Sequence, residues 1–427
     1  FEMATRWIDT ALQNRQDTSV AVLLACLERI ASVAASSYRN EAWLRYARIG
    51  IDASPTKRDK EGWMLAEAVA TNRAGRHVEA DVLFDRVFDA TDDPGLQAAA
   101  LIGKSQFATP ATAWELLEQA AELSSFDALG FWDEAYATGS MGSAARHVGR
   151  YDVAEEMLER SLELARSWGY LVMEGHAAFM LSSIYTATGR LDEAASLREE
   201  AVQLTRRLIG SNVTTSGVRL RAAHTARIRG RLDEAQEHVA LAYRGSDRAD
   251  MRWWRLAAAA HEALIARDGG DIERAGRLLD DAIRTADRAQ DNLALEMLPR
   301  LRIARAGLGL RTGIPADAPR EVVDVLADSE QLDHMEQVQA IDLVSIALTQ
   351  LGRFDDAARL MGAADAERER TGLAVEPPDR DVLERAVEQA RSGLGEAWQV
   401  THSRGREVSL DKAIRLASVM ASRLASG

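Results

Sequence analysis

The strongest constraint on the fold of this chain is a short motif that returns at a nearly constant spacing. The motif is a glycine, a charged residue directly after it and an alanine five residues after it. Its copies begin at Gly75, Gly149, Gly189, Gly230, Gly270 and Gly352. The intervals between these glycines are 74, 40, 41, 40 and 82 residues, so the period is about 40 residues and two copies lack the glycine. This period predicts a repeat array and not a single compact core.

Two stretches fit the copies without the glycine, which the period places near residues 110 and 312. In the first, a Thr-Pro dipeptide precedes a helical pattern over residues 113–123, and in the second a Thr-Gly dipeptide precedes a shorter pattern over residues 321–327. A weaker copy lies at residues 38–42, about 37 residues before the first motif glycine. Together the copies predict eight to nine helix pairs over residues 1–370.

Small side chains recur in phase with the motif at three positions: seven residues before each turn glycine, five after it and twelve after it. The first set is Ala68, Gly142, Ser182, Ala223, Ala263 and Ser345, the second is Ala80, Ala154, Ala194, Ala235, Ala275 and Ala357, and the third is Val87, Ser161, Ala201, Ala242, Ala282 and Ala364. Small residues on one face let helices approach closely. Glycine at a helix C-terminus accepts positive φ. The pattern therefore predicts antiparallel helix pairs joined by glycine turns.

The composition supports an all-α fold. Hydrophobic residues make up 47% and charged residues 28% of the 427 residues, and the chain has only eight prolines. Ala, Leu, Glu and Arg dominate, which favours helix over strand. Chance matches in alanine-rich helices are the alternative explanation of the motif, but six copies in phase disfavour it. Because one helix pair cannot bury its apolar face alone, we expect a right-handed superhelical solenoid with a continuous core and a concave groove.

The last part of the chain, residues 371–427, departs from the regular array. Residues 371–379 hold a glycine and two prolines and are typical of a loop. Residues 381–393 and 409–425 then show helical patterns. We expect these two helices to cap the last repeat, because its apolar face would otherwise be exposed.

Charge and cysteine content exclude several classes of function. The net charge of −14 would repel a phosphate backbone, so we expect no direct nucleic-acid partner. Cys26 is the single cysteine, which excludes an intrachain disulfide and a cysteine-based zinc site and favours a reducing, cytoplasmic location. No apolar run is long enough to span a membrane, and the N-terminus lacks the pattern of a signal peptide. Because the chain begins with Phe1, we expect it to be part of a longer protein with further domains.

No motif for catalysis, a metal or another cofactor stands out. Gly103-Lys104-Ser105 is similar to the end of a phosphate-binding loop, but position 98 is alanine and residues 96–107 fit a helix and not a strand, loop and helix. The eight histidines show no metal-ligand spacing and no accompanying carboxylate cluster. We therefore predict a protein without catalytic activity, cofactor or bound metal. The nine tryptophans are expected to pack against small residues, although one or two could stack on a ligand.

The motif Gly189-Arg-Leu-Asp-Glu-Ala194, with Tyr185 before it and Ala201 after it, resembles a tetratricopeptide repeat in a variant of about 40 residues. The array further resembles the repeat domain of bacterial STAND-type signalling ATPases and of MalT-like, LuxR-type and SARP-type transcriptional regulators. The segments that carry this second resemblance are Glu2-Met-Ala-Thr-Arg-Trp7, Ala357-Ala-Arg-Leu-Met-Gly-Ala-Ala364, Arg368-Glu-Arg-Thr-Gly372, Pro377-Pro378 and Gly405-Arg-Glu-Val-Ser-Leu-Asp-Lys-Ala-Ile414. The resemblance implies that the repeats sense a ligand or partner, while DNA binding or catalysis lies in other domains.

Repeat phase also predicts which side chains line the groove. In this fold the first helix of each pair faces the inside of the superhelix, and polar residues follow its small residue by three to four positions. With nearby aromatic and polar residues, the candidates are Asn72, Arg73, Tyr136, Arg146, His147, His176, Phe179, Ser183, Thr186, His224, Arg227 and Arg267. Arginine offers a planar fork to a carboxylate or phosphate, so this lining suits a protein, a peptide or a small anionic ligand. The alternative is that these arginines are solvated and only favour helix C-termini.

Two functions fit these predictions. The first is a sensor and scaffold segment of a bacterial signal-transduction transcriptional regulator, which binds a small molecule, peptide or protein in its groove. The second is a stand-alone adaptor that assembles protein complexes. A third, enzymatic function has no support from any motif in the sequence.

Overall fold

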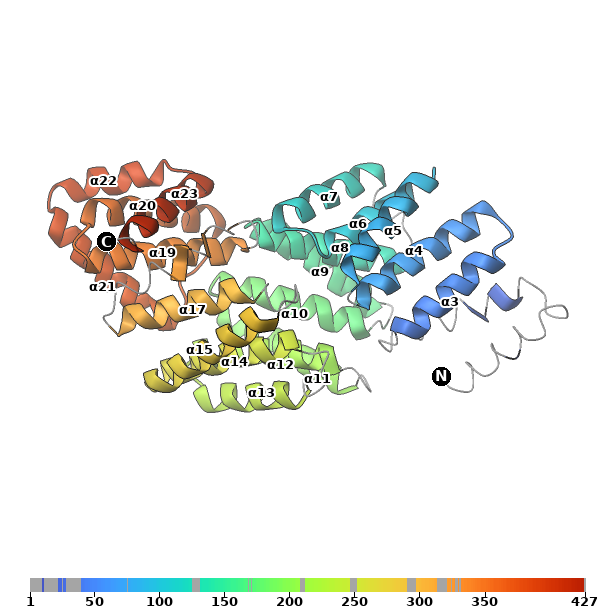
Figure 1. The fold of residues 1–427 in the computed structure, drawn as a ribbon, viewed down its shortest axis with the longest axis horizontal. Helices are drawn as coiled ribbons and strands as arrows, with labels where there is room; N and C mark the ends of the chain where they lie inside the picture. The colour runs from blue at the N-terminus through green and yellow to red at the C-terminus, as the bar shows by residue number, and fades with distance from the viewer. Residues whose placement is uncertain are drawn as a thin grey trace. The chain divides into compact units, whose positions relative to one another are not determined.

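The computed structural model describes residues 40–425 apart from residues 75, 125–130, 168, 170, 208–211, 246–251, 290–296, 313–320, 324, 327, 328, 330 and 331, and describes only residues 10, 22–24, 26 and 27 before residue 40. The regular elements in this part of the chain are helices, and no strand occurs among them. The all-α prediction is confirmed (Figure 1).

The chain divides into two compact units. The first comprises Phe1–Ala144, Arg160–Glu174 and Leu208–Ser211, and the second comprises Ala145–Glu159, Gly175–Arg207 and Asn212–Gly427. The first unit contains α3 (Asn40–Ala53), α4 (Lys57–Arg73), α5 (His77–Ala90), α6 (Pro94–Ser105), α7 (Pro110–Leu123), most of α8 (Phe131–His147) and the end of α9 (Tyr151–Ser167). Successive helices from α3 to α7 pack against one another.

The second unit contains the last residues of α8, the start of α9, most of α10 (Leu171–Ala187) and the remaining helices. These are α11 (Leu191–Arg207), α12 (Asn212–Ile228), α13 (Leu232–Gly245), α14 (Arg252–Asp268), α15 (Ile272–Ala289), α17 (Leu298–Arg311), α19 (His334–Gln350), α20 (Phe354–Thr371), α21 (Pro377–Leu394), α22 (Ala397–Arg406) and α23 (Leu410–Ala425). Neighbours pack in sequence, and the first helices of successive pairs also touch, α12 with α14 and α14 with α17. This stacking is that of a repeat array.

The turn glycines adopt the predicted conformation. Five of the six have φ between 73° and 86°, and Gly75 lies outside the described residues. The amide of the residue after each glycine reaches back to a carbonyl of the preceding helix, as from Arg190 to Tyr185 at 2.7 Å and from Arg231 to Ala226 at 2.8 Å. This is the C-terminal cap that glycine favours because it has no Cβ to clash at positive φ.

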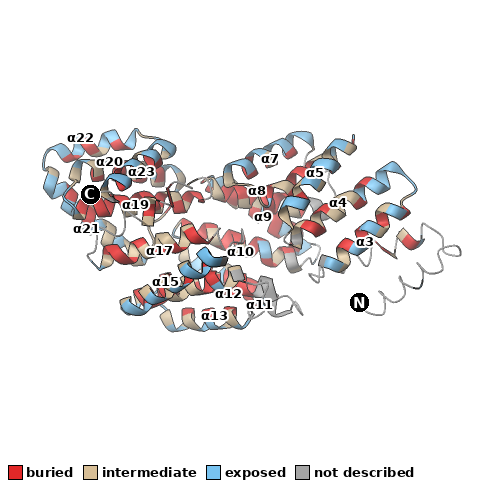
Figure 2. Cartoon of the chain, viewed as in Figure 1, coloured by how far each residue is buried: buried red, intermediate tan, exposed pale blue. Residues whose placement is uncertain are grey.

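The in-phase small residues are buried, as the spacing predicts. Ala80, Ala154, Ala194, Ala235, Ala275 and Ala357 each have 0% of their surface exposed, and the members of the other two sets are buried as well. In Figure 2 buried residues run along one side of many helices, while the other side is exposed. The small residues therefore face neighbouring helices, which confirms the predicted repeat phase.

Two predicted helices begin earlier in the structure than the sequence pattern indicates, since α7 covers Pro110–Leu123 where the pattern predicts residues 113–123, and α21 begins before the predicted residue 381. Thr109 caps α7, which begins at Pro110, because the Thr109 hydroxyl accepts a hydrogen bond from the backbone of Thr112. Near residue 312, α17 ends at Arg311, and residues 313–320 are not described. α21 begins at Pro377, earlier than the predicted residue 381, since proline suits the first turn of a helix. α22 was not predicted from the sequence.

Candidate ligand-binding cavity

The second unit contains a partly open cavity of about 520 Å³. Its wall is built from the end of α8, the middle of α10 and from α12, α14, α17 and α19, which are the first helices of their pairs. Arg368 of α20 and residues 373–383 complete the lining. Within this unit the first helices therefore line the inside, as repeat phase predicts. The volume lies in the range of pockets that bind small ligands or short peptide segments.

One face of α12 carries several residues of the wall. Gly217, Leu220, Arg221, His224 and Arg227 follow one another at steps of three or four residues, so they share one face of the helix. The facing helices contribute apolar surface. These residues include Phe179, Trp253, Trp254, Ala257, Leu264, Ile303 and Leu343. The two tryptophan rings meet edge to face, with centroids 4.6 Å apart.

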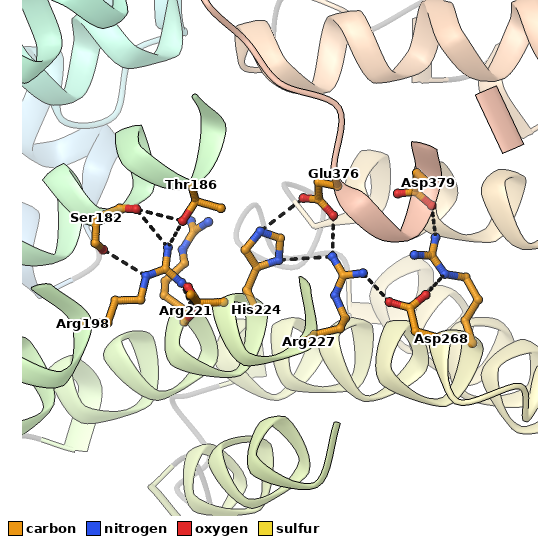
Figure 3. Close-up of polar contacts among 11 residues, drawn as sticks. Ser182, Thr186, Arg198, Arg221, His224, Arg227, Asp268, Glu376 and Asp379 are labelled. Carbon is orange, nitrogen blue, oxygen red and sulfur yellow. Dashed lines mark hydrogen bonds and ion pairs between the residues drawn. The ribbon is translucent and has the colours of Figure 1, made fainter. Parts of the chain in front are cut away.

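Residues 373–379, which we call the groove segment, contribute Leu373, Ala374, Val375, Glu376 and Asp379 to the cavity lining. The amide of Ala374 donates to the carbonyl oxygen of Ala187 at 2.7 Å. The Glu376 carboxylate accepts a hydrogen bond from Arg227 at 2.5 Å and lies 3.2 Å from the Nε2 of His224 (Figure 3). Asp379 lies 3.0 Å from Arg267 and 2.6 Å from Arg311. The segment thus places two carboxylates on arginines of the cavity wall.

Arg146, Arg227 and Arg267, the candidate arginines whose side chains the structure describes, are paired inside the fold. Arg227 donates to Asp268 at 2.6 Å as well as to Glu376 (Figure 3). Arg146 donates to Asp333 at 3.1 Å. Asp333 also caps α19, where it forms a capping box with Glu336. Removal of one partner of a buried ion pair leaves an uncompensated charge. Acidic substitutions at Arg146 and Arg227 would therefore destabilise the fold, and a change in ligand binding by such variants could not be separated from a change in folding.

The histidines of the wall are neutral at pH 7. Burial and the adjacent Arg146 lower the pKa of His147 to about 3, against the opposing effect of Asp333. Burial lowers the pKa of His224, although Glu376 opposes this effect, and burial with His224 nearby holds the pKa of His261 well below its usual value. The positive charge of the wall therefore comes from its arginines.

Carboxylates in the wall respond to the same balance of burial and charge. Burial would raise the pKa of Glu376, but His224 and Arg227 outweigh it and hold this pKa well below its usual value. In Glu336 and Asp342 burial dominates and the pKa values are raised. Glu376 is therefore charged when it holds the groove segment in place.

Six of the twelve candidate groove residues line the cavity. They are Arg146, His147, Phe179, His224, Arg227 and Arg267. Of the remainder in the second unit, Ser183 donates to the carbonyl of Phe179, Thr186 accepts from Arg198 at 2.8 Å, and His176 is exposed. These three are not part of the lining.

The other three candidates lie in the first unit. Asn72 contacts the Nδ1 of His77 at 2.7 Å, and Tyr136 packs against the apolar cluster around Ala135. Arg73 belongs to α4, but its side chain is outside the described part of the structure. The groove predicted to run through all the repeats is thus seen here as a cavity of the second unit, without these residues.

Sequence analysis missed Arg221, Arg300 and the groove segment. Arg221 does not follow the small residue of its helix, but its spacing from His224 and Arg227 places it on the same face, and that signal could have found it. Nothing in the sequence marks Glu376 as a partner of Arg227, 149 residues away along the chain.

Two further searches bear on function. Among the described residues, no group of three or more histidine, cysteine or acidic side chains is placed to hold a metal ion. No helix in the described part of the chain is long and apolar enough to cross a membrane.

Comparison with known proteins shows the repeat class. A family model described as tetratricopeptide repeat matches residues 133–207. A search of curated proteins gave no significant match.

Solved structures share the fold at low sequence identity. The Rap protein in complex with Competence and Sporulation Factor aligns with a TM-score of 0.59 and 12% identity, over 87% of this chain and 99% of that one. The apo form of the quorum sensor NprR from B. thuringiensis aligns with a TM-score of 0.54 and 13% identity, over 80% and 97%. A monomeric mutant of IFIT1 with m7Gppp-AAAA aligns with a TM-score of 0.50 and 14% identity, over 92% and 86%. The chain thus contains a tetratricopeptide-repeat domain and has the helical repeat fold of these proteins.

Proposed function

We propose that this chain is a ligand-binding sensor and scaffold segment, without catalytic activity, of a bacterial signal-transduction transcriptional regulator of the STAND, LuxR or SARP type. Its cavity would take a peptide, a small molecule or a short part of a partner protein. Binding would be read by other domains of the parent protein.

The cavity in the second unit carries this proposal. It combines a volume of about 520 Å³ with apolar surface and a few convergent polar groups, which is the usual composition of a binding pocket. The groove segment shows that the same wall accepts extended backbone and carboxylates. The fold is shared with a quorum sensor and with a Rap protein crystallised with a factor, which supports a role in sensing.

Filling the cavity tests the proposal. Gly307 lines the cavity, and a Cβ placed there would make ordinary contact with Leu343, 3.6 Å away, and with Arg267, 4.0 Å away. Gly307→Phe would therefore occupy cavity volume while keeping the fold. We expect members of a library of short synthetic peptides and small carboxylic acids to raise the melting temperature of the native chain, and Gly307→Phe to lose that response.

The matched control is Gly62→Phe in α4, because Gly62 is exposed and nothing lies within 4 Å of a Cβ there. This variant should keep the response. If Gly307→Phe responded like the native chain, the cavity would not be the binding site. The adaptor hypothesis would gain if no library member bound while the chain co-purified with a stoichiometric protein partner in both variants.

A further inference from the structure

Six of the seven arginines in the cavity wall have a carboxylate partner within the fold. The pairs not yet described are Arg300 with Glu336 at 2.5 Å and Arg368 with Asp342. Five carboxylates belong to the wall, and a sixth, Asp268, pairs with Arg227 and Arg267. The wall is therefore close to neutral, with one arginine left over.

The remaining arginine is Arg221. Among the described residues its guanidinium has no ion pair and no hydrogen bond. The guanidinium carbon lies over the Phe179 ring, 5.8 Å from the ring centroid. The backbone of Arg221 is held, because its carbonyl accepts a hydrogen bond from Arg198 (Figure 3). The side chain lines the cavity wall and has five N–H donors to offer a ligand.

The surroundings of Arg221 make its charge energetically costly. Burial and the like charges of Arg146 and Arg300 lower its pKa to about 10, although Asp333 and Glu336 oppose this effect. Arg221 therefore stays charged at neutral pH, although no carboxylate among the described residues contacts it. A half-buried charge without an ion-pair partner destabilises a fold, and such groups concentrate at functional sites.

We propose that Arg221 is the anion-recognition residue of this cavity and that it binds the carboxylate or phosphate group of a ligand whose apolar body packs on Phe179, Trp253 and Trp254. The planar fork of arginine matches either oxyanion with two parallel hydrogen bonds. The groove segment shows the same chemistry a few residues away, where Glu376 occupies Arg227. This inference rests on the proposed binding function and deepens it by naming the class of ligand.

The test compares anions on the purified full chain. The melting temperature is measured at pH 7 with sodium succinate, sodium phosphate and sodium chloride at matched ionic strength. We expect succinate or phosphate to raise it above the chloride value, and the anion that does so identifies the oxyanion. Arg221→Gln should abolish this rise, with the dissociation constant of the anion weakened roughly tenfold to a hundredfold, since a hydrogen bond to a charged group contributes about 1.5–3 kcal/mol.

Two controls separate binding from folding. Arg229→Gln removes the same charge from the end of the same helix, at an exposed residue that pairs with Asp192, and should leave the anion response intact. The free Arg221→Gln variant should melt at the same temperature as the native chain or higher, because the like-charge repulsion is gone. Arg221→Lys should keep part of the response.

Three results would overturn the inference: equal melting temperatures of the native chain in all three salts, an unchanged anion response in Arg221→Gln, or an anion response lost equally in Arg229→Gln. The proposed binding function fails separately. The binding function is supported if a library member still raises the melting temperature of Arg221→Gln but not that of Gly307→Phe. It is contradicted if every library member changes the melting temperatures of Gly307→Phe and Gly62→Phe equally.

Discussion

Gly362 in α20 and Gly405 in α22 lie at a crossing where two backbones come into close contact. A Cβ at Gly362 would overlap the carbonyl oxygen of His402, and a Cβ at Gly405 would overlap that of Arg359. Both glycines belong to the sequence segments that resemble the closing part of regulator repeat domains. Their small size is thus explained by packing, since no side chain fits between these helices.

Gly362→Ala should lower the free energy of unfolding by about 1–3 kcal/mol, as overpacking of a close helix contact does. Gly276→Ala in α15 is the matched control, because a Cβ there meets only Leu308 at 3.8 Å. The control should be neutral or stabilising by up to about 1 kcal/mol. Urea denaturation of both variants measures the difference, and equal effects would show that the crossing tolerates a methyl group.

At the scale of elements, the groove segment follows α20 and includes the first turn of α21, and polar contacts hold it against α10 and α12. Glu376 binds α12 through His224 and Arg227, and the Ala374 amide binds the end of α10. The sequence predicts a loop here from Gly372 and the two prolines, but it does not predict that the loop occupies a cavity. Release of this segment would open more of the wall to a ligand.

Glu376→Gln should loosen the groove segment. Loss of the charged contacts to Arg227 should raise the hydrogen-exchange rate of the Ala374 amide by about tenfold or more, since such contacts contribute about 1.5–3 kcal/mol. Exchange measured by mass spectrometry on a peptide that spans residues 373–376 checks this. Glu384→Gln, at an exposed position of α21, is the control and should leave the rate unchanged. Native exchange in Glu376→Gln would mean that the ion pair does not hold the segment.

At the scale of the whole molecule, stability depends on many buried ionisable groups within the helical stack. Three neutral histidines and several carboxylates share the interior of the second unit. A histidine with a folded pKa below its unfolded value of about 6.5 contributes stability above that value, and the contribution is lost as pH falls toward the folded pKa. As pH falls, the free energy of unfolding should therefore decrease at pH values above those at which the well-paired carboxylates become protonated.

The free energy of unfolding should fall between pH 7 and pH 5. His147, with a folded pKa of about 3, should account for about 1–2 kcal/mol of this loss. Glu336 and Asp342 act in the opposite direction because their pKa values are raised. His147→Gln should flatten the profile measured by urea denaturation across this range, while His176→Gln, at an exposed histidine, should not. Parallel profiles for native chain and His147→Gln would contradict a buried neutral His147.

The sequence by itself determined the repeat, because glycine turns and small residues at fixed spacing are local requirements of helix pairs. It therefore predicted the fold class, the turn positions and the buried faces, and repeat phase placed Arg146, Arg227 and Arg267 at one inner surface. Only the tertiary structure decided which charges cancel. Arg227 meets Glu376 and Arg146 meets Asp333 across 149 and 187 residues of chain, and such pairings leave no periodic signal. Burial and proximity, which arise from the stacking of the helices, left Arg221 as the wall arginine without an acidic partner among the described residues.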